Sequence, residues 1–222
     1  MRKTTILSTI KLNAAHVEIF SKNNIELLQY NFIKILPLNF KLPSHNASWI
    51  FTSKNAVDAV YSSNEKVKCN EMPHYCVGEK TKLALVKNGQ KVIKMCNNSV
   101  KLANFIINND KNGKYVFCRG SIINKDFSDF FHTNEINLNE IAVYQTELVP
   151  EKINSTVDGI MFFSPSAIKS FLKKNTLNNS ECFCIGKTTS NFAKNFSSKI
   201  HYCEKPSIEN VIKQTINFFK NG

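Results

Sequence analysis

Short apolar runs alternate with longer amphipathic stretches along most of this chain. Runs such as Thr5–Thr9 and Trp49–Thr52 are rich in β-branched or aromatic residues, which is typical of strands. The stretch after Ser207 instead places apolar residues at the i, i+3, i+4 spacing of a helix that buries one face. Regular alternation of strand and helix predicts an α/β fold in which parallel sheets are flanked by helices.

Two parts of the chain repeat each other, piece by piece and in the same order. Ile50–Val57 and Met161–Ile168 share the pattern Phe-x-Ser-x-x-Ala followed by valine or isoleucine. Further along, Val77–Thr81 matches Ile185–Thr189, and in both copies the same spacing separates the glycine from a serine that opens an amphipathic stretch. An internal repeat of this kind predicts two similar domains.

The order of the repeated pieces predicts how the chain is shared between the domains. The units follow each other as a, b, a, b, so the outer two segments can pair and enclose the inner two. We therefore expect a discontinuous outer α/β domain formed by 1–34 and 149–222, and an inserted α/β domain at 41–140. The crossings between them are expected as two linker strands at 35–40 and 141–148.

Small polar residues and glycines mark the expected turns from strand to helix. Ser53 and Ser164 are candidate N-caps, and Pro165 suits the first position of a helix. Gly78 and Gly186 end strands where the backbone has to turn tightly. Such turns lie at the carboxyl ends of parallel strands, where free backbone N–H groups and the helix dipole attract anions. Capping alone explains any single turn, but several in both halves, expected to face a shared cleft, favour a ligand with several separated negative charges.

The charge of the chain allows two interpretations. It carries 29 Lys and Arg against 17 Asp and Glu, a formal net charge of +12. Dispersed lysines are compatible with an ordinary solvated surface, whereas an anionic partner is the functional alternative. We find no zinc-finger spacing and no aromatic RNA-binding signature, which argues against a nucleic-acid partner.

Composition narrows the chemistry further. The seven cysteines form no Cys-x-x-Cys pair and the five histidines share no ligand spacing, so we expect no metal site and no disulfide framework. Neither a Gly-x-Gly-x-x-Gly motif nor a Walker loop is present, which argues against a nucleotide cofactor. No apolar run approaches the roughly 18 residues of a membrane span or forms a secretory signal. These features predict a cytoplasmic protein with no membrane association.

Six short motifs occur in order along the chain. They are Phe51–Ser53, Cys76–Thr81, Cys118–Gly120, Val143–Thr146, Phe163–Ser166 and Ile185–Thr189. Together these motifs resemble the uroporphyrinogen-III synthase family. The similarity extends in order over nearly the whole chain and implies two α/β domains with parallel sheets, a two-stranded linker and a discontinuous outer domain. One departure is Ser8-Thr9, where many relatives carry Thr-Arg.

The resemblance also implies an activity. The family closes the linear tetrapyrrole hydroxymethylbilane into uroporphyrinogen III, inverts its last ring (ring D), and uses no metal or cofactor. Departure of the terminal hydroxyl as water leaves an azafulvene-like electrophile, which is attacked at a substituted carbon to give a spiro intermediate. The substrate is a polycarboxylate, as the helix starts suggest. The alternative from another class is a non-catalytic anion- or nucleic-acid-binding module.

Site residues follow from the same resemblance. Tyr144 matches the tyrosine proposed to donate a proton to the departing hydroxyl, and a phenol is protonated at neutral pH. From the residues alone, a structural role is the more common one for a tyrosine on a strand, and only the resemblance favours the catalytic role. The residues expected to bind the substrate are Thr52, Ser53, Gly78, Thr81, Arg119, Ser164, Ser166, Gly186, Thr188 and Thr189. We expect the chain to act as a monomer.

Overall fold

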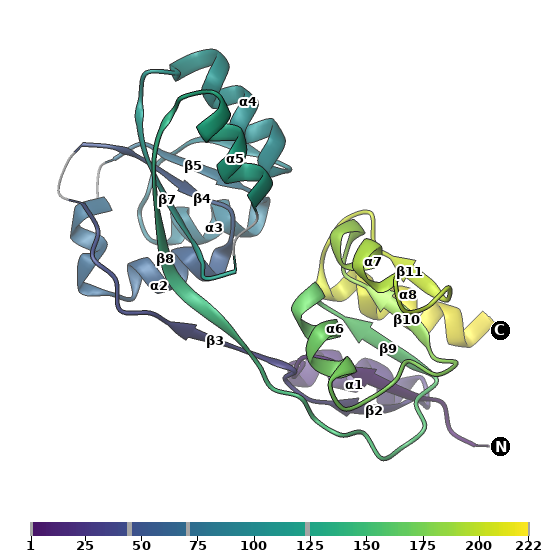
Figure 1. Cartoon of the computed structure of the whole chain (residues 1–222). Helices are drawn as coiled ribbons and strands as arrows, with labels where there is room; N and C mark the ends of the chain where they lie inside the picture. The colour runs from purple at the N-terminus through teal and green to yellow at the C-terminus, as the bar shows by residue number, and fades with distance from the viewer. Residues whose placement is uncertain (1, 44–45, 70–71, 123–124, 222) are drawn as a thin grey trace. The chain divides into compact units, whose positions relative to one another are not determined.

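The computed structural model describes residues 2–43, 46–69, 72–122 and 125–221, which form two compact units (Figure 1). Unit 1 is Met1–Lys34 with Glu147–Gly222, and unit 2 is Ile35–Thr146. Unit 1 therefore combines two segments that lie far apart in the sequence. Both units are α/β, as predicted; their independence as folding domains stays a prediction.

Unit 1 contains a five-stranded, wholly parallel sheet in the order β11-β10-β9-β1-β2. Its strands are β1 (Thr5–Ser8), β2 (Glu26–Gln29), β9 (Gly159–Phe162), β10 (Glu181–Cys184) and β11 (Ile200–Tyr202). Side chains of successive residues point to opposite faces of a strand, so apolar runs cover both faces. Thus Leu7 packs in one core cluster of the unit and its neighbour Ile6 in the other.

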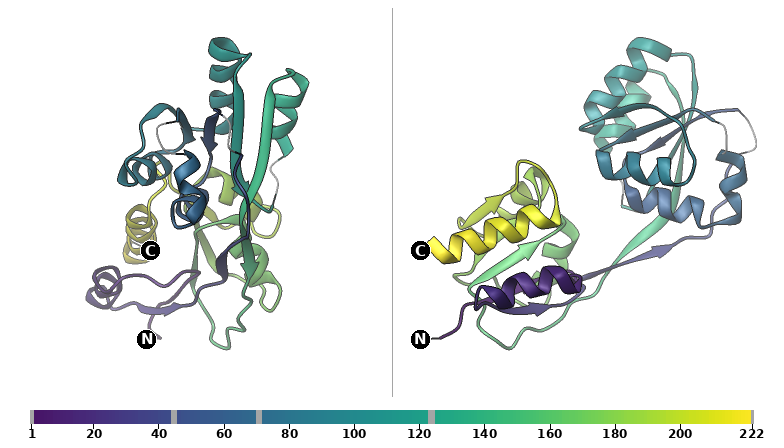
Figure 2. Two further views of the ribbon diagram at one scale, coloured as in Figure 1. Left: turned by 90° about the vertical axis from the view of Figure 1, so that its left-hand side faces the viewer. Right: turned by 180° about the vertical axis from the view of Figure 1, so that it is seen from behind.

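Helices cover both faces of this sheet. They are α1 (Ala14–Lys22), α6 (Pro165–Leu172), α7 (Lys187–Ala193) and α8 (Ile208–Asn221). Helices α1 and α8 lie together on one face (Figure 2, right), where Phe20 and Ile212 pack against the sheet. On the other face, Phe171 and Ala193 bring α6 and α7 against it. The long apolar stripe after Ser207 is α8, and Ser207 Oγ accepts from Asn210 N as a cap.

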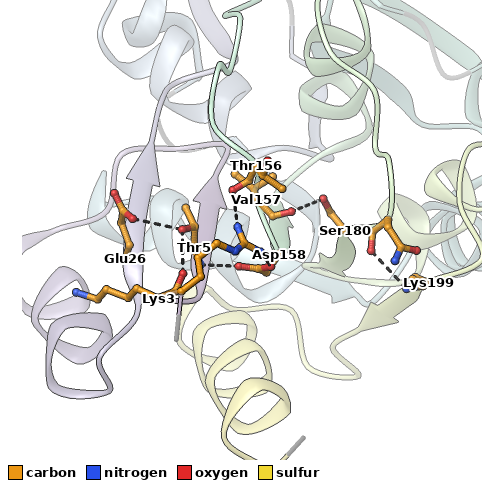
Figure 3. Close-up of polar contacts among 10 residues, drawn as sticks. Lys3, Thr5, Glu26, Thr156, Val157, Asp158, Ser180 and Lys199 are labelled. Carbon is orange, nitrogen blue, oxygen red and sulfur yellow. Dashed lines mark hydrogen bonds and ion pairs between the residues drawn. The ribbon is translucent and has the colours of Figure 1, made fainter.

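The two segments of unit 1 are joined between β1 and β9 (Figure 3). Asp158, just before β9, accepts from Thr5 N at 2.8 Å through Oδ2, and its own amide donates to Thr5 O at 2.8 Å. The guanidinium of Arg2 pairs with the other carboxylate oxygen. This set of bonds fixes the register of the N-terminal strand against the C-terminal segment.

Unit 2 contains a six-stranded sheet in the order β3-β8-β7-β4-β5-β6. Its strands are β3 (Ile33–Pro37), β4 (Ser48–Phe51), β5 (His74–Val77), β6 (Val92–Cys96), β7 (Lys114–Gly120) and β8 (Asn137–Leu148). The strands from β8 to β6 are parallel. Leu38 N bonds to Val143 O and Val149 N to Phe32 O, so β3 runs antiparallel to β8. The expected linker strands are thus hydrogen-bonded into a sheet.

The helices of unit 2 again form one layer on each face. They are α2 (Lys54–Tyr61), the 3₁₀ helix η1 (Asn64–Cys69), α3 (Glu79–Lys87), α4 (Ser99–Asp110) and α5 (Lys125–Thr133). Val57 and Leu85 bring α2 and α3 against one face, and Leu102 and Phe131 bring α4 and α5 against the other. The predicted opening serine of α4 is its first residue, and Asn98 is the N-cap because its side chain accepts from Lys101 N.

Candidate active site

The hydroxyl of Tyr144 meets the hydroxyl of Ser53 within unit 2. Tyr144 lies on β8 with its ring partly buried against the core cluster that α2 and α3 share with the sheet. Its Oη donates to Ser53 Oγ at 3.3 Å. Ser53 is the N-cap of α2, as predicted, and its Oγ accepts from Asn55 N at 3.1 Å. The predicted proton donor is therefore hydrogen-bonded to a helix cap at the carboxyl end of β4.

A bulge in the pairing of β7 with β8 places the tyrosine. Arg119 pairs with Ala142, whereas Gly120 pairs with Tyr144, so Val143 is an extra residue on β8. The side chain of Val143 is fully buried in the core. Ser121 N then donates to Tyr144 O at 2.8 Å, which fixes the backbone at the tyrosine. Bulges turn side chains to new directions at sheet ends, and here the result is the contact with the helix cap.

Arg119, a predicted substrate ligand, is engaged within the protein. Its Nε donates to Glu140 Oε2 at 2.7 Å, and its Nη1 donates to the Gly120 carbonyl at 2.9 Å. The side chains of Arg119 and Glu140 are only 17% and 16% exposed. His132 Nε2 lies 3.8 Å from the second oxygen of Glu140. Sequence reasoning missed Glu140, because only the register of β7 and β8 shows that it is the partner of Arg119.

The other predicted residues of unit 2 lie at the same edge of the sheet. Thr52 follows β4, and Gly78 follows β5 as the N-cap of α3. Gly78 has φ +83°, a conformation that favours glycine, and its amide donates to Cys96 O at 2.9 Å. Thr81, in the first turn of α3, is only 4% exposed. The anion-attracting group at this turn is the helix start, and Glu79 already places a carboxylate there.

In unit 1 the predicted residues gather at the starts of α6 and α7. Ser164 caps α6 by accepting from Ala167 N at 3.1 Å, and Ser166 follows in the first turn. Gly186 lies in the short turn between β10 and α7, as predicted, but its φ of −176° is ordinary extended backbone that any residue can adopt. A side chain at this position would approach the Pro206 ring to 3.2 Å, which makes space the reason for the glycine.

The two threonines after Gly186 differ in accessibility. Thr188 is exposed, whereas Thr189 is 3% exposed. The first turn of α7 contains no acidic residue, and Lys187 is exposed beside it. This helix start therefore offers an anion a more favourable field than the start of α3.

Of the predicted site residues, the structure brings Tyr144 and Ser53 into direct contact and places the rest at the carboxyl edge of one sheet or the other. Ser8 and Thr9, which stand where many relatives carry Thr-Arg, both make hydrogen bonds within unit 1. Thr9 is buried and its Oγ1 donates to Met161 O at 2.8 Å, while Ser8 Oγ donates to Ile10 O at 2.7 Å. These side chains complete backbone hydrogen bonding and bring no cation to the edge.

A separate cavity of about 480 Å³ lies at the opposite, amino edge of the unit 1 sheet. Arg2, one of the lining residues, pairs with Asp158, and Lys199 Nζ lies 3.6 Å from Glu181 Oε1 nearby. His201 Nε2 approaches the other oxygen of Glu181 at 2.9 Å. The cavity is lined by two cations, Arg2 and Lys152, and by two carboxylates, Asp158 and Glu181. With as many carboxylates as cations in its lining, it suits a polyanion poorly.

Thiol and metal chemistry have little basis in the described part of the chain. Six cysteines are free and buried, and burial raises the pKa of the Cys76 and Cys184 thiols to about 12. A thiol with so high a pKa is a poor nucleophile and metal ligand at neutral pH. Among the described residues no three His, Cys, Asp or Glu side chains gather as a metal site, and no described helix is long and apolar enough to span a membrane.

Two α/β units, one of them discontinuous, with polar residues at the carboxyl ends of their parallel strands define a two-domain α/β protein. The model of the family described as uroporphyrinogen-III synthase HemD matches residues 15–213. The chain belongs to that family.

Individual relatives agree with this assignment. The porphyrin biosynthesis protein HemD of Ruminiclostridium josui is 26% identical over 117 residues, which are 48% of this chain and 23% of that protein. The chain thus matches about a quarter of the length of this curated relative. Crystal structures of the Helicobacter pylori uroporphyrinogen-III synthetase and of a Thermus thermophilus uroporphyrinogen III synthase mutant have the same fold. The Helicobacter structure has a TM-score of 0.73 at 19% identity, and the alignment covers 97% of this chain and 99% of that one. The Thermus structure has a TM-score of 0.68 at 11% identity, and the alignment covers 98% of both chains.

Proposed function

We propose that this chain catalyses the uroporphyrinogen-III synthase reaction, in which hydroxymethylbilane is cyclised with inversion of ring D and loss of water. The observation that carries the proposal is the hydroxyl pair of Tyr144 and Ser53 at the carboxyl edge of the unit 2 sheet, in a chain that belongs to the HemD family. A phenol whose hydroxyl is held in place by a hydrogen bond is suited to assist the departure of a hydroxyl group.

Tyr144 is the proposed catalytic donor, and Ser53 supports it. In the free chain Tyr144 Oη donates to Ser53 Oγ. A serine hydroxyl both donates and accepts, so this bond can reverse when substrate arrives. Ser53 then donates to Tyr144 Oη, and the phenol proton is directed to the departing hydroxyl. Such a chain of hydrogen bonds strengthens the donor, because each bond polarises the next.

The carboxylates of the substrate are proposed to bind at helix starts in both units. Ser53 Oγ accepts from Asn55 N and Ser164 Oγ from Ala167 N, and the cap carbonyls accept from Ala56 N and Ile168 N. The amides of Lys54 and Ser166 are therefore the ones proposed to bind carboxylates. At α7 we propose that Thr188 and the neighbouring backbone hold a carboxylate. Thr81 and Thr189, which are nearly buried, are proposed to shape these turns from beneath. Thr52, Gly78, Ser166 and Gly186 complete the proposed binding set.

Arg119 is proposed as a carboxylate ligand that exchanges partners. A guanidinium presents five N–H donors, and Glu140 and the Gly120 carbonyl account for two of them. A substrate carboxylate can therefore be bound by the other side of the fork. The cost is competition with Glu140, which already neutralises part of the charge.

We also propose that the protein works in the cytoplasm as a monomer, with no nucleic acid or membrane as partner. The six described cysteines are free, which suits a reducing compartment. Tyr144, Ser53 and Arg119 lie in one unit of one chain, so this part of the proposed site needs no second copy. Sedimentation equilibrium at micromolar concentration tests the monomer directly.

The deciding experiment is incubation of the purified protein with hydroxymethylbilane, oxidation of the product and chromatographic identification of the porphyrin isomer. Uroporphyrin III in excess over a protein-free reaction supports the proposal. Formation of only the unrearranged isomer, at the protein-free rate, contradicts it. If the protein then binds the type III product with strongly salt-dependent affinity but without turnover, the non-catalytic anion-binding module is the better description.

A further inference from the structure

Gly120, the last residue of β7, lies directly against the ring of Tyr144. A Cβ atom at this glycine would be 2.8 Å from Cζ of the tyrosine and 3.0 Å from both Cε2 and Oη. Non-bonded carbon atoms are best separated by about 3.5–4.0 Å. No side chain beyond hydrogen fits at this position while the tyrosine keeps its place.

Backbone conformation does not explain this glycine. Among the described glycines, positive φ angles occur at Gly78 and Gly89, and Gly120 is not one of them. It lies in a strand, where glycine weakens the structure and often marks the close approach of another group. The group that approaches here is the phenol of Tyr144, so the requirement at Gly120 is for space.

The backbones on both sides are fixed, which leaves the ring as the part that can move. Gly120 is paired with Tyr144 across the bulge, and Ser121 N holds the tyrosine carbonyl at 2.8 Å. A methyl group at Gly120 would have to displace the ring by about 0.7 Å to reach an ordinary contact. The Tyr144–Ser53 bond is already 3.3 Å long, so a displacement of this size away from Ser53 would break it, and one in any direction moves the hydroxyl.

We propose that Gly120 is a positioning residue, whose missing side chain sets the place of the Tyr144 hydroxyl for proton donation. The inference rests on the proposed synthase function. Its consequence is that the smallest enlargement, Gly120→Ala, moves the donor while leaving the fold intact, because the far end of a side chain yields more easily than a strand. Misplacement of a catalytic group by about 1 Å can cost about 10²-fold in rate.

Kinetics provide the first test. We expect Gly120→Ala to lower kcat for type III formation by about 10- to 100-fold and to leave KM within about twofold. Gly113→Ala is the matched control, because it makes the same change just before the same strand, beside Asp110 and Tyr115. It should leave kcat unchanged. Equal kcat values for Gly120→Ala and the native protein would overturn the proposal, as would a loss confined to KM.

A double variant separates positioning from general damage. If Gly120 acts only through the tyrosine hydroxyl, Gly120→Ala should have no further effect on kcat in a Tyr144→Phe background. Multiplication of the two losses would contradict the proposal. Should Gly120→Ala fold poorly, Gly120→Ala/Tyr144→Ala should restore the melting temperature by removing the ring that clashes, and failure to do so would equally count against it.

A spectroscopic test is independent of activity. With tyrosine labelled by ¹³C at Cζ, Tyr144→Phe identifies the Tyr144 resonance as the one that disappears. This resonance should shift in Gly120→Ala and stay in place in Gly113→Ala. If the native protein makes no type III isomer, the proposed function fails, but the resonance still reports whether Gly120 places the ring. An unmoved resonance in Gly120→Ala would overturn the positioning role even in an active synthase.

Discussion

Arg119 and Glu140 form an ion pair of 2.7 Å at the carboxyl edge of the unit 2 sheet. Both side chains are largely screened from solvent, so the pair is stronger than one on an open surface. It holds the guanidinium in a defined direction. It also supplies a carboxylate that competes with any carboxylate of a ligand, and these two effects have opposite consequences for binding.

We predict that competition is the larger effect. Glu140→Gln should tighten binding of uroporphyrinogen III by about three- to tenfold, because the neutral amide no longer competes with the ligand for the guanidinium. A tenfold change corresponds to about 1.4 kcal/mol of binding free energy. Arg119→Met should weaken it. Glu147→Gln on the same strand makes an equal change in net charge and is the control. Isothermal titration under anaerobic conditions measures all three. Weaker binding by Glu140→Gln than by the control would show that Glu140 orients Arg119 instead.

Removal of the Tyr144 hydroxyl should separate catalysis from binding. Tyr144→Phe keeps the ring beside Gly120 and loses the bond to Ser53. If the phenol is the main proton donor, type III formation should fall by about 10²- to 10⁴-fold, with product affinity and melting temperature nearly unchanged. The residual product should remain mainly type III, since substrate folding needs no donor. Full activity in a folded Tyr144→Phe protein would make the tyrosine structural.

Much of this architecture was predictable because it depends on local chemistry. Ser53 and Ser164 are short polar residues between an apolar run and a helical pattern, and both cap their helices. The pairing of Arg119 with Glu140 was not predictable. It depends on the register of β7 against β8, which is set by packing of residues distant in sequence. The pattern of apolar and polar residues likewise does not show how close the ring of Tyr144 comes to Gly120.

Buried His74 should make stability depend on pH below neutrality. Its Nδ1 lies 2.7 Å from the Met72 carbonyl, which can only accept, so Nε2 accepts from Tyr61 Oη at 2.7 Å. Burial lowers the pKa of His74 from 6.5 to about 4. Between these values the unfolded chain binds a proton that the folded chain does not, so stability is lost as pH falls from 6.5 toward 4.

The loss from this one group should approach about 3 kcal/mol, at about 1.4 kcal/mol for each unit of pKa difference. Urea unfolding at a series of pH values measures it. His74→Gln should flatten the dependence between pH 6.5 and 4, whatever its own stability. His132→Gln, at a histidine whose side chain is 65% exposed, should leave the slope as it is. An unchanged slope in His74→Gln would assign the effect to other groups.

The boundaries of unit 2 predict which fragment folds alone. A fragment of residues 35–146 retains nearly all of β8 and most of β3, whereas one of residues 41–140 ends β8 at Glu140. The shorter fragment loses the partners of Cys118, Arg119 and Gly120 on β7 and removes Val143 from the core. Full burial of one valine is worth about 1.5–3 kcal/mol, and the lost hydrogen bonds between β7 and β8 add to this.

The 35–146 fragment should therefore unfold cooperatively in urea and have native-like circular dichroism. The 41–140 fragment should unfold at a clearly lower midpoint. Equal midpoints would mean that the second half of β8 contributes nothing to unit 2. A 35–146 fragment without a cooperative transition would show that unit 2 depends on unit 1 to fold.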